Sequence, residues 1–241
     1  MKKYPWISMV AFATLLLGCK DEKPQPKVIY ESTGKASKTE AKKGDKLTLV
    51  DLPIQFEGTD VLLFPVGEVV MNEEKLSKYE SSSYEESTNF TVANTNEFEI
   101  AGNLSNIKFQ VKPSDSLVSL TTQPIHIDRV SYLHAVAPLV KKQLLIYEVE
   151  DADTNQDGQI NGNDIHSLYI STLEGTQFQK ISPDLHEVIG WNVIEGRKQL
   201  YFRAIEDLNK NGAFDKEDKV HYYRVDLSVL PVQPQEFDPL N

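Results

Sequence analysis

The sequence predicts an all-β domain built from antiparallel sheets, and three observations support this prediction. Most apolar residues fall in short runs rich in Val, Ile, Leu, Tyr and Phe, a composition that favours strands. Clusters of Gly, Pro, Asn, Asp and Ser separate these runs, as turns do. Finally, a strand–loop–strand unit occurs twice, around two loops rich in Asp, Asn and Gly.

The N-terminal residues have the pattern of a secretory signal rather than of a fold. Residues 1–18 combine a basic start with an apolar stretch over Trp6–Leu17 that is too short to span a membrane. The sequence Leu16-Leu17-Gly18-Cys19 resembles a bacterial lipobox, which implies that Cys19 becomes the acylated first residue of the mature chain. Outer-membrane lipid, held through this acylated cysteine, is therefore an expected partner.

Lys20-Asp21-Glu22 resembles the surface-export signal of Bacteroidetes lipoproteins. The resemblance implies an outer-membrane lipoprotein displayed on the cell surface, and display towards the periplasm is the alternative. Residues 19–45 are rich in Lys, Pro, Ser and Thr, so we expect a flexible tether followed by one domain over 46–241.

The chain is strongly acidic, with a formal net charge of −11. Removal of residues 1–18 takes away two Lys, leaving 23 basic and 36 acidic residues, or −13. Such a charge repels nucleic acid, so we expect no nucleic-acid partner.

Strand-like runs follow one another along the domain. They are 47–50, 61–66, 98–100, 107–111, 117–120, 125–133, 141–150, 166–173, 178–181, 188–194, 199–206 and 220–229. The polar stretch 71–89 is interpreted as a short helix near 73–79 or as a loop. The Pro-rich tail 231–239 is expected to be extended.

The loop Asp153–Asp164 has the spacing of a calcium-binding loop. Its oxygen ligands would be Asp153, Asn155, Asp157, Asn161 and Asp164, with the backbone carbonyl of Gln159. Gly158 permits the sharp turn at the sixth position, and Ile160 would hold the loop against the core.

The loop Asp207–Asp218 repeats this pattern. Its ligands would be Asp207, Asn209, Asn211, Asp215 and Asp218, with the backbone carbonyl of Ala213. Both loops resemble the EF-hand loop, and their final Asp resembles dockerin-type loops. The dockerin resemblance implies a helix over Asp164–Leu173. The β-branched and aromatic flanks instead predict hairpins that pair 143–150 with 166–172 and 199–206 with 220–227, with a calcium loop at each tip.

A further resemblance concerns the architecture. The segments Ser167–Gly175, Gln179–Asp184 and Gln199–Phe202 resemble one blade of the TolB-like β-propeller repeats, and Ile107–Val149 resembles a blade more loosely. Because a closed propeller has four or more blades and this chain is short, the resemblance implies an incomplete or open propeller-like stack of antiparallel sheets.

No catalytic pattern emerges from the sequence. The five His lack zinc-motif spacing, and there is no nucleophile elbow, P-loop or dinucleotide motif. Trp191, Tyr169, Tyr201, Tyr222 and Tyr223 could form a carbohydrate platform, although strand alternation favours the core for about half of them. We therefore expect a lipid-anchored envelope protein with two structural Ca²⁺ ions and no enzymatic activity. A surface module for protein or glycan and an accessory enzyme with an unrecognised site remain the alternatives.

Overall fold

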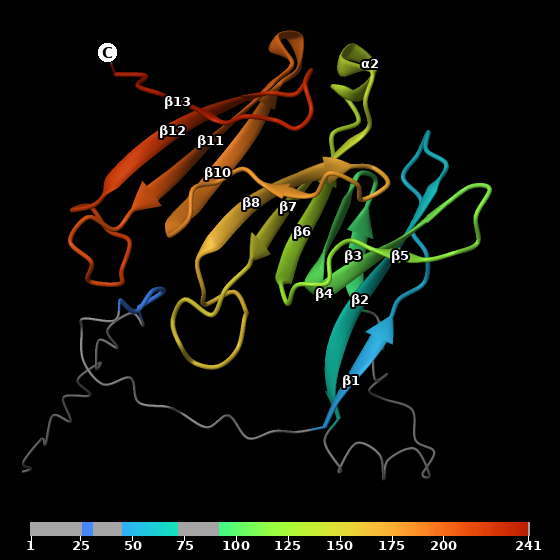
Figure 1. Ribbon diagram of the computed structural model, residues 1–241, viewed down its shortest axis with the longest axis horizontal. Helices are drawn as coiled ribbons and strands as arrows, with labels where there is room; N and C mark the ends of the chain where they lie inside the picture. Colours follow the sequence, from blue (N-terminus) through green and yellow to red (C-terminus); the bar gives the residue numbers. More distant parts are fainter. Residues whose placement is uncertain (1–25, 31–44, 72–91, 241) are drawn as a thin grey trace, which may run out of the picture.

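A computed structural model describes residues 26–30, 45–71 and 92–240, which form two antiparallel β-sheets (Figure 1). The first sheet contains β1 (Asp45–Val50), β2 (Val61–Met71), β3 (Ala93–Asn96), β4 (Glu99–Val111), β5 (Val118–Ser119), β6 (His126–Tyr132), β7 (Leu144–Glu150), β8 (His166–Thr172) and β9 (Gln179–Lys180). The second contains β10 (His186–Ile194), β11 (Gln199–Glu206), β12 (Lys219–Asp226) and β13 (Gln235–Phe237). The all-β prediction is confirmed.

The internal repeat corresponds to two four-stranded meanders. Strands β6, β7, β8 and β9 are neighbours in that order, and so are β10, β11, β12 and β13. In each meander a helical turn, α2 (Ala137–Val140) or the 3-10 turn η2 (Glu195–Arg197), joins the first strand to the second. The acidic loop joins the second strand to the third, so both loops lie at the edge of the molecule opposite the helical turns (Figure 1).

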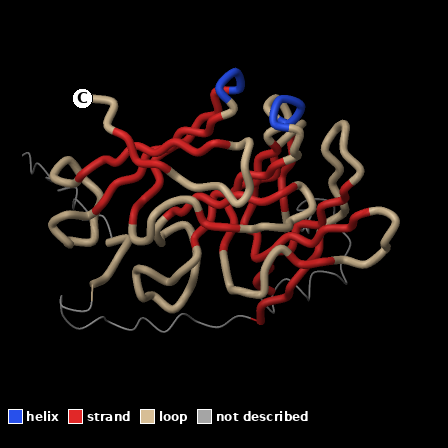
Figure 2. The backbone as a smooth tube through the Cα atoms, turned by 45° about the horizontal axis from the view of Figure 1, so that its top comes forward, coloured by secondary structure: helices blue, strands red, loops and turns tan. Residues whose placement is uncertain are grey.

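Two apolar clusters form the core. Strand β7 contributes to both, because Leu145, Tyr147 and Val149 pack into the first cluster while Leu144 and Ile146 pack into the second. Period-two alternation therefore places apolar residues on both faces of this strand, which explains its continuous apolar sequence. The second cluster also contains side chains of β8, β10, β11 and β12, so the second sheet packs on the β7–β8 part of the first (Figure 2).

Both predicted hairpins are present. Strand β7 pairs with β8 from Leu144↔Thr172 to Glu150↔His166, and β11 pairs with β12 from Gln199↔Asp226 to Glu206↔Lys219. The residues after the first loop form strand β8, so the helix that the dockerin resemblance implied over 164–173 is wrong. The extended tail contributes β13, which pairs with β12.

Some predicted boundaries are wrong, for identifiable reasons. The runs 98–100 and 107–111 are joined in one long strand, β4, which begins at Glu99, although turn-forming residues lie between them. Tertiary contact overrides local preference there: a Cβ on Gly102 would lie 2.6 Å from the Val92 carbonyl oxygen, so glycine lets the neighbouring chain approach. The strand predicted from residue 141 begins at Leu144, because Lys141 has φ 55° and ends α2.

The two sheets, over the part of the chain that is described, do not close into a barrel or a complete propeller. The signal over 1–18, Cys19 and nearly all of the stretch 71–89 lie outside the described residues. Within 26–30, 45–71 and 92–240 we find no helix long and apolar enough to cross a membrane.

Candidate metal sites

The first acidic loop is organised by hydrogen bonds from its own backbone to the side chains that the calcium pattern singles out. Asp153 accepts from the N–H groups of Asp157 (3.0 Å) and Gly158 (2.9 Å). Asn155 Oδ1 accepts from Asp157 N–H at 3.0 Å, and Asp157 Oδ1 accepts from Gln159 N–H at 2.8 Å. The candidate ligands at positions 1, 3 and 5 are thus fixed against the loop.

The closing residues of the same loop are fixed in the same way. Asn161 Oδ1 accepts from Asn163 N–H at 2.9 Å. The carboxylate of Asp164 is fully buried and accepts from the N–H groups of Thr154 (2.8 Å) and Asn161 (3.0 Å). Asp164 therefore joins the beginning of the loop to its end.

The second loop repeats this arrangement position by position. Asp207 accepts from the N–H groups of Asn211 (3.2 Å) and Gly212 (2.8 Å), and Asp218 accepts from those of Leu208 (3.1 Å) and Asp215 (2.8 Å). Asn209, Asn211 and Asp215 accept from the N–H groups of Asn211, Ala213 and Glu217 at 2.9, 2.7 and 2.8 Å. In each loop seven side-chain oxygen atoms, from five residues, accept seven backbone N–H bonds, and these bonds correspond between the two loops.

Backbone conformation agrees as well. Gly158 and Gly212, at the sixth position, have φ 87° and 81°, and Gln156 and Lys210, at the fourth, have φ 58° and 55°. Two sequences that differ at most positions adopt the same strained backbone, which is the expected result when both fit one loop geometry.

The donor set suits a hard cation. Each loop offers three carboxylates, two amide oxygens and one backbone carbonyl, and Ca²⁺ in proteins takes six to eight oxygen ligands. An oxygen that accepts one N–H retains a second lone pair for a cation. Asp164 Oδ1 accepts from both Thr154 N–H and Asn155 N–H, so its Oδ2, which accepts only from Asn161 N–H, is the oxygen left for the ion.

Residues 26–30 lie between the two loops and bond to both (Figure 1). Ile29 N–H donates to the Thr154 carbonyl at 2.8 Å, and Lys27 N–H donates to the Gly212 carbonyl at 2.8 Å. The hydroxyl of Thr154 donates to the Lys27 carbonyl at 2.7 Å, while Val28 between them is only 4% exposed. The expected tether over 19–45 thus includes a docked stretch, which we call the docked segment (residues 26–30).

The docked segment also contacts the loops through side chains. The Gln156 side chain donates to the Ile29 carbonyl at 3.2 Å, and Lys210 Nζ lies 5.8 Å from the centre of the Tyr30 ring. Burial and the carboxylate of Asp207, the first ligand position of the second loop, raise the pKa of Tyr30 to about 12. The docked segment therefore reaches the candidate ligand shell itself.

Histidine and carboxylate side chains gather where the strands meet the loops. In the first meander His126 Nδ1 lies 2.7 Å and His166 Nδ1 2.6 Å from the fully buried carboxylate of Glu150. Burial opposes ionisation of Glu150, but the two histidines lower its pKa to about 2. Burial also opposes protonation of His166, but Glu148 and Glu150 raise its pKa to about 10. Glu150 also raises the pKa of His126, so both imidazoles of this cluster face carboxylates that favour their charged form.

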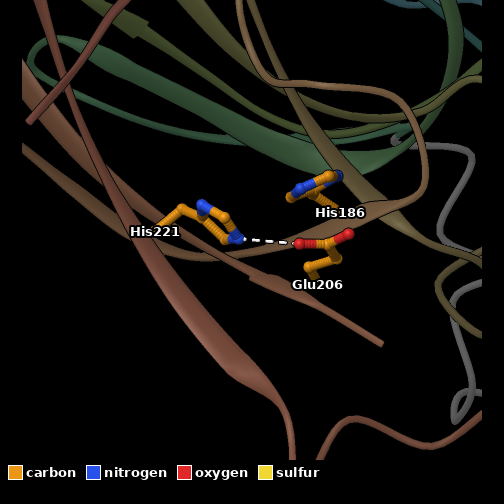
Figure 3. A group of neighbouring side chains, drawn as sticks. All are labelled: His186, Glu206 and His221. Carbon is orange, nitrogen blue, oxygen red and sulfur yellow. Dashed lines mark hydrogen bonds and ion pairs between the residues drawn. The ribbon is translucent and has the colours of Figure 1, made fainter. Parts of the chain in front are cut away.

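The second meander carries the corresponding trio, His186, Glu206 and His221 (Figure 3). His221 Nε2 lies 2.9 Å from Glu206 Oε2, and its Nδ1 lies 2.7 Å from Glu236 Oε1. Among the described His, Cys, Asp and Glu residues, this trio and the group His126, Asp128 and Glu150 each bring three candidate ligand atoms within 4.8 Å of one another, whereas the three carboxylates of neither acidic loop do so.

Sequence reasoning found no zinc-motif spacing among these histidines. Their grouping depends on strand register, since His126 pairs with Glu150 and His186 pairs with Glu206 across neighbouring strands. The available signal was the repeat itself, because both a first-strand His and a second-strand Glu recur one meander later.

The aromatic residues divide between core and surface. Tyr223 is buried and stacks on Phe202 with ring centres 4.8 Å apart. Tyr201, Tyr222 and Phe237 are half-buried and line a hollow of about 320 Å³ on the second sheet, to which Phe202 and Tyr223 also contribute. The centre of the Phe237 ring is 5.8 Å from that of Tyr201 and 6.3 Å from that of Tyr222.

A larger hollow of about 890 Å³ lies beside α2 at the other edge of the molecule. His134, Glu57 and Glu174 are among the residues that line it, and neither of the two His–carboxylate groups of the described residues does. No family model, curated protein or solved structure matches the chain.

Proposed function

We propose that this protein is a lipid-anchored envelope protein whose two acidic loops bind structural Ca²⁺ ions and hold the docked segment against the domain. The observation that carries the proposal is the correspondence of seven side-chain hydrogen bonds between loops of different sequence. Each bond uses a side chain at a position that calcium loops use for ligands.

Calcium would act on stability rather than as a switch. Each loop joins two paired strands, and the described part of the chain contains no pair of helices that could open on binding. Neutralising three carboxylates per loop would remove their mutual repulsion and tighten the loop ends. Because the docked segment bonds to both loops, calcium would also strengthen its attachment.

A calcium titration by calorimetry tests this proposal. We expect two ions per chain with affinities on the order of 10⁻⁴ M, as in extracellular modules. Asp157→Asn and Asp215→Asn each remove one charge but keep the Oδ1 acceptor that Gln159 or Glu217 N–H uses. Each variant should weaken one site only.

Asp226→Asn is the matched control, because Asp226 Oδ1 also accepts one backbone N–H, at 2.8 Å, but lies outside both loops. It should leave both affinities unchanged. Binding of fewer than two ions, or equal weakening by all three variants, would contradict the assignment of the loops.

The open, propeller-like description of the sheets belongs to the same proposal. It is supported by the two consecutive four-stranded meanders, each with a helical turn at one end and an acidic loop at the other. Packing of the second meander on the first through one shared apolar cluster also supports it.

Anchoring would place the acidic loops near the membrane. Only six residues separate Cys19 from Pro26, where the docked segment begins, and seven extended residue steps reach at most about 25 Å. An acyl chain on Cys19 would therefore keep the loop edge close to the lipid surface. Cell-surface display is the favoured side, on the resemblance of Lys20-Asp21-Glu22 to an export signal.

A second candidate function is glycan binding on the outer face of the second sheet. Tyr201, Tyr222 and Phe237 are half-buried there and line one hollow together with Arg203. Aromatic faces beside polar groups suit the mixed apolar and hydroxyl surface of a sugar. Affinity electrophoresis with soluble polysaccharides should show retardation that Tyr222→Ala abolishes and Tyr222→Phe keeps. Absence of retardation with every polysaccharide would remove this candidate.

A further inference from the structure

Strand register brings His186, Glu206 and His221 to one face at one end of the second sheet. Glu206 pairs with His186 on β10, and Ala204, two residues before it on the same face, pairs with His221 on β12. The alternation that buries Phe202 and Ala204 in the core thus continues to Glu206 at the end of β11. Figure 3 shows the three side chains converging from three different strands.

In both histidines Nδ1 makes the outer hydrogen bond, which leaves Nε2 for a shared ion, and on His221 this Nε2 already faces Glu206 Oε2 at 2.9 Å. Nδ1 of His186 lies 2.9 Å from the carbonyl oxygen of Asp184, which can only accept, so this nitrogen carries a proton. Nδ1 of His221 lies 2.7 Å from the Glu236 carboxylate, which accepts likewise. Metal-binding histidines are characteristically held in this way, with the other nitrogen directed at the ion.

The available ligand atoms are close enough for one ion. One atom from each of the three residues lies within 4.8 Å of the others, and His221 Nε2 is already 2.9 Å from Glu206 Oε2. Ligands of a tetrahedral zinc ion lie about 3.4 Å apart, given bonds of about 2.0–2.2 Å. The Glu206 side chain is 41% exposed, so it has room to make the small adjustment.

The first meander shows what a purely ion-paired version looks like. There Nδ1 of both His126 and His166 faces the central Glu150, and His166 Nε2 lies 3.5 Å from Glu148. Glu150 is completely buried between them, and its two oxygens are taken by the two histidines. In that trio neither Nδ1 is hydrogen-bonded to an acceptor outside the cluster, unlike in the second trio. The first trio therefore serves as an internal control for zinc binding.

We propose that His186, Glu206 and His221 form a binding site for a first-row divalent transition ion, for which Zn²⁺ is the probe. Two imidazoles and one carboxylate suit such an ion better than Ca²⁺, which prefers oxygen ligands alone. Three protein ligands leave one coordination position for water or a ligand, and the exposed side of Glu206 gives access to it. The site is distinct from the two calcium loops and does not depend on them.

Zinc titration calorimetry on the full chain, with calcium in excess, tests the proposal. We expect one zinc ion per chain with an affinity on the order of 10⁻⁶ M or tighter, lost in the double variant His186→Asn/His221→Asn. His126→Asn/His166→Asn removes the same chemistry from the first meander and should leave zinc binding unchanged. Both variants retain Cys19, so any zinc binding by an unmodified Cys19 thiol is the same in both.

A milder variant covers the case in which the double variant fails to fold. Glu236→Gln keeps all three ligands and an oxygen acceptor for His221 Nδ1, and it should weaken zinc binding about 10- to 100-fold. Cobalt bound at the site should give the intense visible absorption of tetrahedral coordination. The proposal is overturned if zinc does not bind, if Glu236→Gln binds zinc as tightly as the wild type, or if the His126/His166 variant is the one that loses it.

Discussion

Two glycines at the same loop position provide a controlled test of the docked segment. Gly158 and Gly212 both have strongly positive φ, so Ala at either position carries a similar backbone cost of about 1–2 kcal/mol. A Cβ on Gly158 would meet nothing within 4 Å. On Gly212 it would lie 2.4 Å from the Val28 carbonyl oxygen and 2.8 Å from Pro26 Cβ. Only Gly212→Ala should therefore push the docked segment away.

The extra cost follows from what the docked segment would lose. The Lys27 N–H to Gly212 carbonyl bond is worth about 1 kcal/mol, and exposure of Val28 costs about 1.5–3 kcal/mol. We therefore expect Gly212→Ala to lower the free energy of unfolding by about 3.5–6 kcal/mol, against about 1–2 kcal/mol for Gly158→Ala. The unfolded-state effect of replacing Gly by Ala is common to both and cancels.

Urea unfolding with and without calcium measures the difference, and trypsin cleavage after Lys27, followed by mass spectrometry, reports the docked segment directly. Gly212→Ala should speed this cleavage, whereas Gly158→Ala should not. Equal losses of stability together with equal cleavage after Lys27 would refute the conclusion that the docked segment stabilises the domain through Gly212.

Two further predictions concern pH and anchoring. Because Glu150 holds the pKa of His126 above 6.5, this contact stabilises the fold fully below pH 6.5 and fades as the pH rises through the folded-state pKa. His126→Gln should thus cost about 2 kcal/mol near pH 6 and less near pH 9 in urea unfolding, and a cost that grows with pH would contradict this. Cys19→Ser, expressed in the native host, should move the protein from the membrane to the soluble fraction, and unchanged fractionation would end the lipoprotein proposal.

Local sequence signals predicted the elements that depend on local chemistry. Alternating β-branched and aromatic residues located strands such as β7 and β11 and predicted the hairpin around each loop, and the Asp/Asn/Gly spacing located the loops themselves. Residues whose type suggests a turn but whose tertiary contacts place them in a strand were harder to predict. Strand β4 crosses Gly102, which looks like a turn in the sequence but allows close approach of the chain at Val92.

Features that depend on register or on distant contacts were not predictable in the same way. The trio His186, Glu206 and His221 forms only once β10, β11 and β12 are aligned, and no short motif connects its members. The docked segment was hidden in a polar stretch, although Val28-Ile29-Tyr30 is an apolar run within it. That run was the one local sign that this part of the tether could bury surface.

The most direct test of the central claim is a thermal melt of the protein in calcium and in chelator. With two sites of about 10⁻⁴ M affinity, about 1 mM Ca²⁺ stabilises the fold by roughly 2.8 kcal/mol, which corresponds to about 6–11 °C for a domain of this size. Asp153→Ala with Asp207→Ala removes the first ligand of each loop, so the melting temperature of this variant should no longer depend on calcium. Identical wild-type melts in calcium and in chelator would contradict the proposal that these loops hold structural calcium.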